Sequence, residues 1–63
     1  METKESKIKR YEHTADTYEK KGKREWAYAK NGQGGEHYYH ARQAFERAEN
    51  FRNRANDLKS KND

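Results

Sequence analysis

The sequence predicts an all-α protein, an antiparallel hairpin of two long helices that meet along a seam of alanine and glycine. In the second half of the chain alanine recurs every seven residues, at Ala41, Ala48 and Ala55, a step that returns to one face of an α-helix. Three of the four glycines fall within residues 31–35, and the chain contains no proline. A short glycine-rich link between two helical segments is typical of an antiparallel helix pair.

The first helix is expected over about residues 3–31. Thr3 is a suitable N-cap, because its side-chain oxygen can accept a hydrogen bond from a free amide of the first turn. A loop at residues 32–35 and a second helix over about residues 36–60 complete the expected hairpin, so that residues 1–63 form a single domain. A second seven-residue row runs along the first helix: Ile8, Ala15, Gly22 and Ala29.

Gly22 leaves an alternative with three helices open. Lysines followed by glycine, as at Lys20, Lys21 and Gly22, are typical of a helix end. A new helix starting at Lys23 and Arg24 would, however, place two cations at its positive end without a capping side chain. Because Gly22 also keeps the seven-residue step, we predict one continuous helix through it.

Side-chain size predicts the register of the hairpin. If the chain turns in the middle of residues 32–35, residue i of the first helix lies near residue 67 minus i of the second. Large residues then face small ones: Phe45 faces Gly22, Ala41 faces Trp26, and Phe51 faces Ala15.

Two helices alone cover large apolar side chains only in part. Pairing of two hairpins into a four-helix bundle, a homodimer, would cover them further, and so would a target protein. The residues expected to remain partly uncovered are Ala44, Phe51 and Leu58 on one flank of the second helix, with Trp26, Tyr28 and Tyr39 near the loop.

Composition excludes several classes of protein. The chain has 63 residues, 41% charged and 29% hydrophobic, and its aromatic content of 13% is too high for a typical disordered tail. It has no cysteine and no apolar run long enough for a membrane span or a signal peptide. We therefore expect a cytoplasmic protein with no membrane partner.

No arrangement of residues predicts catalysis. His37 and His40 lie one turn apart with Glu36 beside them, a conceivable metal site, but His13 falls far along the hairpin and adds no ligand. The tyrosines and carboxylates show no spacing of nucleophile, base and orienting group. We interpret the histidines as surface residues and expect no enzyme activity, no cofactor and no bound metal.

The basic residues predict nucleic-acid binding, with RNA as the first expectation. The formal net charge is +4, and cations along the outer faces of two helices lying side by side can follow a phosphate backbone. Carboxylates interrupt these rows, so an ordinary solvated surface is the competing interpretation. The candidate residues are Lys20, Lys21, Lys23, Arg24, Lys30, Arg47 and Arg54.

The alternative function is that of a regulator or inhibitor that docks on a larger protein through its aromatic loop end, in the manner of a phage or plasmid accessory protein. Trp, Tyr and Arg side chains dominate binding energy at protein interfaces. The candidate residues are Trp26, Tyr28, Tyr39, Arg42 and Phe51.

Two resemblances stop short of a family. The spacing Tyr38-x2-Ala41-x3-Phe45-x2-Ala48 resembles the second helix of a tetratricopeptide repeat. The period of 34 residues does not recur, and Gly32 stands where that repeat has an aromatic residue. The expected shape is similar to that of the Rop family of plasmid RNA-regulatory proteins, with which the chain shares no sequence motif.

Overall fold

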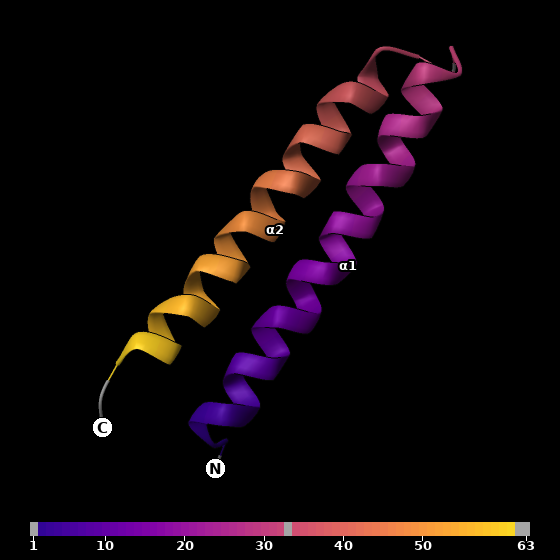
Figure 1. Ribbon diagram of the computed structural model, residues 1–63. Coiled ribbons are helices and arrows are strands. Elements are labelled where there is room, and N and C mark those ends of the chain that lie inside the picture. The colour runs from indigo at the N-terminus through magenta and orange to yellow at the C-terminus, as the bar shows by residue number, and fades with distance from the viewer. Residues whose placement is uncertain (1, 33, 62–63) are drawn as a thin grey trace.

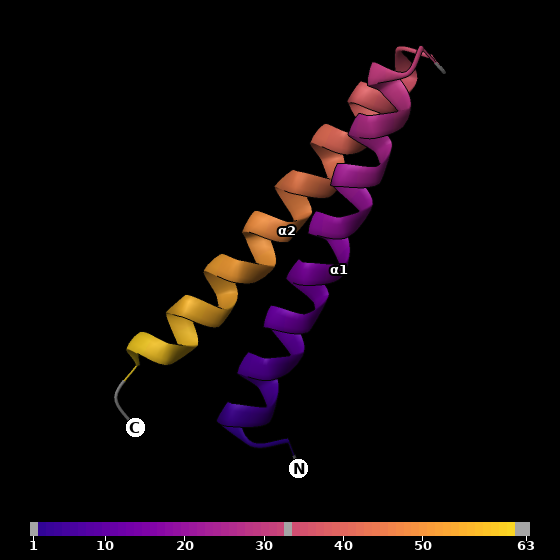
Figure 2. The ribbon, with the colours of Figure 1, turned by 45° about the vertical axis from the view of Figure 1, so that its right-hand side comes forward.

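The computed structural model describes residues 2–32 and 34–61, and all regular secondary structure in this part is helical. Helix α1 spans Lys4–Lys30 and helix α2 spans Glu36–Ser60. The two helices run side by side in opposite directions, with both ends of the chain at one end of the rod (Figure 1). The rod measures 49 × 16 × 13 Å, and a second view shows the same pairing (Figure 2). The predicted all-α helical hairpin is thereby confirmed.

The ends of the helices follow from local chemistry. The Thr3 hydroxyl accepts a hydrogen bond from the Ser6 amide at 3.0 Å, which confirms the predicted N-cap. In the connection, Gly32 has φ 79° and Gly34 has φ 122°, values that residues with a Cβ rarely adopt. These glycines let the chain leave α1 and turn back into α2. Neither helix of the described residues is long and apolar enough to cross a membrane.

Helix α1 continues through Gly22, so the alternative with three helices is wrong. The ring of Phe45 lies directly against the backbone at this point. A Cβ placed on Gly22 would lie 2.7 Å from Cε1 of Phe45, well inside the roughly 3.5–4.0 Å of a normal carbon contact. Only glycine leaves room for this ring, and the predicted pairing of Gly22 with Phe45 is confirmed.

The core consists of small residues. No large side chain of the described residues is fully buried. Close approach along such a seam brings the helix backbones together and leaves large side chains at its two sides. The buried residues are Ala15, Gly22 and Ala29 of α1 and Ala41, Ala44, Ala48 and Ala55 of α2.

Two rows of side chains flank this seam, and every ring contact and ion pair between residues of these rows stays within one flank. We name the flanks after their aromatic residues. The tyrosine face comprises Tyr11, Tyr18 and Glu25 of α1 and His37, Ala44, Phe51 and Leu58 of α2. The tryptophan face comprises Glu12, Glu19 and Trp26 of α1 and Tyr38, Phe45, Arg52 and Lys59 of α2.

The close contact at Gly22 gives a first prediction. Enlarging Gly22 to leucine should lower the free energy of unfolding by about 1–3 kcal/mol through overpacking, although leucine gains roughly 1 kcal/mol of helix propensity over glycine. Thermal unfolding followed by circular dichroism, at a fixed protein concentration, measures the change. In a Phe45→Ala background the ring is gone, so Gly22→Ala should instead stabilise by about 1 kcal/mol. A Gly22→Leu variant more stable than the wild type would contradict the contact.

Candidate nucleic-acid interface

Three half-buried rings form the centre of the tyrosine face. Phe51 of α2 lies between two tyrosines of α1, with its ring centroid 6.0 Å from that of Tyr11 and 6.0 Å from that of Tyr18. The rings of Tyr18 and Phe51 are nearly parallel, at 4°. Tyr11 and Tyr18 lie one turn before and one turn after Ala15 on α1. Phe51 therefore lies at the level of Ala15, as the register predicted from side-chain size requires.

Cations follow both edges of this ring cluster. The guanidinium of Arg47 lies 5.7 Å from the centre of the Tyr18 ring, and that of Arg54 lies 5.2 Å from the centre of the Phe51 ring. Contact with an aromatic face favours a cation and holds the planar group along the ring. Five cations border the tyrosine face: Lys7 and Lys21 on α1, Arg47 and Arg54 on α2, and Lys61 directly after α2.

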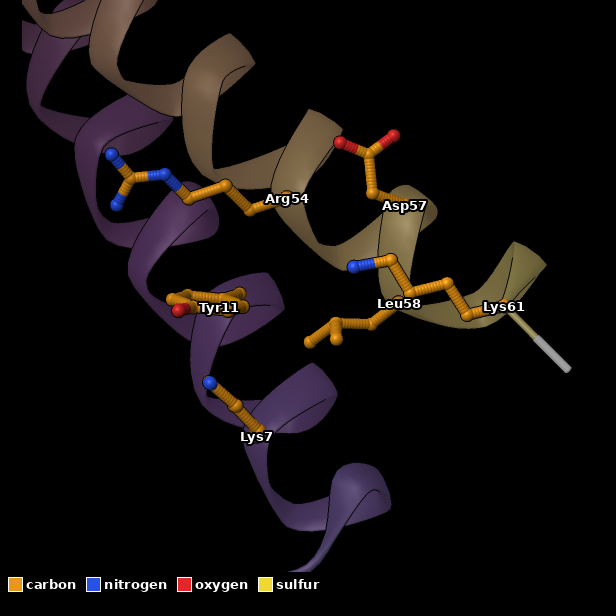
Figure 3. A pocket seen from close by; sticks show the side chains of 6 residues that line it. All are labelled: Lys7, Tyr11, Arg54, Asp57, Leu58 and Lys61. Carbon is orange, nitrogen blue, oxygen red and sulfur yellow. The ribbon is translucent and has the colours of Figure 1, made fainter. Parts of the chain in front are cut away.

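Two hollows open between the rings and these cations. The larger, of about 180 Å³, lies near the chain ends, where Arg54 and Leu58 reach from α2 toward Tyr11 and Lys7 of α1 (Figure 3). A smaller one, of about 30 Å³, lies between Tyr18, Lys21, His40, Gln43, Ala44 and Arg47. Both are smaller than the roughly 300 Å³ of an ordinary small-molecule pocket, so the tyrosine face is a shallow groove lined mainly by cations, with the carboxylate of Asp57 also at its larger hollow.

The cations of the tyrosine face have no ion-pair partner among the described residues, whereas the carboxylates of the tryptophan face are paired. There, Arg52 lies 2.9 Å from Asp16 and 3.3 Å from Glu19. Lys59 lies 2.6 Å from Glu12. Two carboxylates lie beside the cations of the tyrosine face without pairing with them, so the positive charge there is offset only in part.

The loop end of the tyrosine face is fixed by a polar contact. Nδ1 of His37 donates a hydrogen bond to Oε2 of Glu25, and the His37 ring also packs beside Tyr28, with centroids 5.5 Å apart. The hydrogen bond from His37 holds the pKa of the Glu25 carboxyl below its ordinary value, partial desolvation opposes this, and the charges of His37, His40 and Lys21 add to the lowering. No three histidine or acidic side chains within residues 2–32 and 34–61 are placed to share a metal ion.

The structure brings three of the seven predicted nucleic-acid-binding residues together. Lys21, Arg47 and Arg54 border the tyrosine face. At about 100° per residue, the side chains two positions from Gly22 lie on the far side of α1, and those directly after a seam residue lie at the edge of the tryptophan face. Lys20 and Arg24 occupy the first of these positions, and Lys23 and Lys30 the second.

Arg47 and Arg54 were expected on the outer face of the second helix, and their placement over rings corrects that expectation. Each follows a residue of the tyrosine face by three positions, so helix geometry brings it to the groove and not to the outside. Sequence reasoning missed Lys7 and Lys61. A signal was present, because Lys7 and Lys21, and Arg47, Arg54 and Lys61, lie at multiples of seven residues.

The predicted protein-binding residues divide among three sides of the rod. Trp26 lies on the tryptophan face, with its ring centroid 4.8 Å from that of Tyr38. Tyr28 and Phe51 lie along the tyrosine face. Tyr39 lies on the far side of α2, where its hydroxyl accepts a hydrogen bond from Gln43 at 2.8 Å, and Arg42 lies at the edge of the tryptophan face and pairs with Glu46 at 3.3 Å.

No protein-family model matches the chain, and comparison with curated proteins and with solved structures finds no match. The function is therefore inferred from the surface of the hairpin itself.

The contact between Glu25 and His37 gives a second prediction. Replacing His37 by alanine removes the main cause of the lowered Glu25 pKa, so that pKa should rise toward its ordinary value, which NMR titration of the Glu25 carboxyl carbon measures. His40→Ala is the matched control and should change it less, since His40 contributes only its charge.

The same contact has a consequence for stability. A carboxyl whose pKa is lower in the folded than in the unfolded state stabilises the fold above its ordinary pKa, and this contribution is lost as the pH falls through the lowered value. Below about pH 4.3, wild-type protein should therefore lose more stability than His37→Ala. Equal losses would show that the contact is not formed in solution.

Proposed function

We propose that this protein is a non-enzymatic nucleic-acid-binding protein whose tyrosine face takes a strand of RNA. The observation that carries the proposal is a set of five cations along both edges of a groove floored by Tyr11, Tyr18 and Phe51; none of the five has an ion-pair partner within the described part of the chain. Lysine and arginine supply affinity for phosphates. Aromatic rings supply surfaces on which unpaired bases stack.

The dimensions of the groove favour a single strand over a duplex. Cations seven residues apart on one helix are separated by about 10 Å along the axis, and the two helices place such cations on both sides of the rings. A strand lying between them can direct phosphates to the edges and bases to the floor. In a duplex the bases are paired and cannot reach the rings, so single-stranded segments of RNA are the proposed ligand.

We also propose that the protein acts as a homodimer. All of its fully buried apolar residues within the described part are alanines, and large side chains left partly exposed are stabilised when a second hairpin completes a four-helix bundle.

A second candidate function, a regulator or inhibitor that docks on a larger protein, is favoured by the exposure of the loop end. Tyr39 is 61% exposed and Tyr28 is 39% exposed, and exposed tyrosines are frequent anchors of protein interfaces. Under this alternative, replacing Tyr28 and Tyr39 by alanine should weaken the protein complex by about 2 kcal/mol or more, with little effect of salt.

The third prediction separates site binding from general attraction to positive charge. Replacing Lys7, Lys21, Arg47 and Arg54 by glutamine should flatten the slope of log affinity against log salt by about 3, because roughly 0.7 counterions are released per phosphate contact on a single strand. Fluorescence anisotropy with a short labelled RNA of mixed sequence measures this. The control replaces Lys9, Lys20, Lys23 and Lys30, which removes the same charge from the other sides of α1 and should change the slope much less.

Equal losses in the two variants would mean that net charge and not the tyrosine face attracts RNA. Wild-type protein without affinity for this RNA in dilute salt would overturn the proposal and favour the docking function. Circular dichroism of each variant checks that helix content is unchanged.

A further inference from the structure

The tryptophan face holds the least covered large apolar side chains of the seam's two flanks. Trp26 is 46% exposed, Tyr38 is 41% exposed and Phe45 is 36% exposed. The rings of Trp26 and Tyr38 meet edge to face, and Phe45 lies over Gly22, one turn along α1 from Trp26 and two turns along α2 from Tyr38. Together they form an uncovered aromatic cluster in the half of the rod nearer the connection.

The charges of the residues that define the tryptophan face cancel, although two lysines lie at its edge. Its two carboxylates, Glu12 and Glu19, pair across the helices with its two cations, Lys59 and Arg52. A partner for this face therefore needs apolar surface, and it needs no complementary charge.

The net charge of each face decides whether a second copy of the chain can cover it. In a two-fold dimer each patch meets a copy of itself, so a patch with net charge repels its own copy. On the tyrosine face, Lys7, Lys21, Arg47 and Arg54 have no ion-pair partner among residues 2–32 and 34–61, so this face is unsuited to self-association. The tryptophan face has paired charges beside its rings and can meet its own copy with less repulsion.

The exposed area of the chain is large enough for an interface with a second copy. The chain exposes 5045 Å², whereas a compact monomer of 7.6 kDa exposes about 4,300 Å². The excess, about 750 Å², is close to the roughly 800 Å² that each partner contributes to a standard protein interface.

We propose that a second copy of the chain covers the tryptophan face, with a two-fold axis passing through the cluster of Trp26, Tyr38 and Phe45. This differs from the flank expected from the sequence, because Ala44 is already buried and Phe51 is covered by Tyr11, Tyr18 and Arg54. In the resulting four-helix bundle, both tyrosine faces remain open to solvent. The proposal rests on the homodimer proposed above, whose interface it names, and not on RNA binding.

Sedimentation without nucleic acid tests the proposal with two neighbouring tyrosines. Wild-type protein at micromolar concentration should have twice the chain mass. Tyr38→Glu places a charge in the interface and should raise the dimer dissociation constant about thirtyfold or more. Tyr39→Glu, the same change one position along α2 and outside the tryptophan face, should leave the dimer intact. A wild-type monomer with full helix content, or equal effects of the two changes, would overturn the proposal.

Cross-linking provides a second measurement in case Tyr38→Glu loses its fold. The chain has no cysteine, so one introduced thiol reports on its own surroundings. A short bismaleimide should join two Tyr38→Cys chains rapidly and two Tyr28→Cys chains slowly, since Tyr28 borders the tyrosine face. Faster joining through Tyr28→Cys would place the dimer interface on the tyrosine face and overturn the proposal.

Discussion

Close approach of two helix backbones along a seam of alanine and glycine is the constraint on which the rest of the structure depends. The seam has room for the methyl groups of alanine, and at Gly22 the absence of a Cβ leaves room for the edge of the Phe45 ring. Because larger side chains cannot enter it, they are displaced to the two flanks. The exposed rings of the protein are therefore a direct result of how closely its helices approach.

Displacement to two flanks also separates the charges. On the tryptophan face, carboxylates of α1 meet Arg52 and Lys59 of α2 and are neutralised. At the centre of the tyrosine face the side chains between the helices are rings, and the two arginines at its edge, Arg47 and Arg54, lie over those rings without an ion-pair partner among the described residues. A chain with a modest net charge of +4 thus presents one neutral and one basic surface, which suit different ligands.

This division gives each flank a separate role in the proposals above. Neutral aromatic surface is suited to a copy of itself, and basic aromatic surface is suited to phosphates and bases. The two roles do not compete, because residues of one flank point away from the other across the seam. Binding of RNA and dimerisation are therefore expected to be independent of one another.

The sequence by itself determined the hairpin, because each of its features is local. The seven-residue rows of small residues, the Thr3 cap and the glycines of the connection act through helix geometry and backbone conformation. Tertiary structure decided which charged residues act together. Lys21 borders the groove, whereas Lys20 lies on the far side of α1. Arg47 lies over the Tyr18 ring of α1, and Arg54 lies over the Phe51 ring, which packs against α1. A helix pattern fixes the angle between two side chains on one helix, but only contact with the second helix decides which angles face the groove and which face solvent.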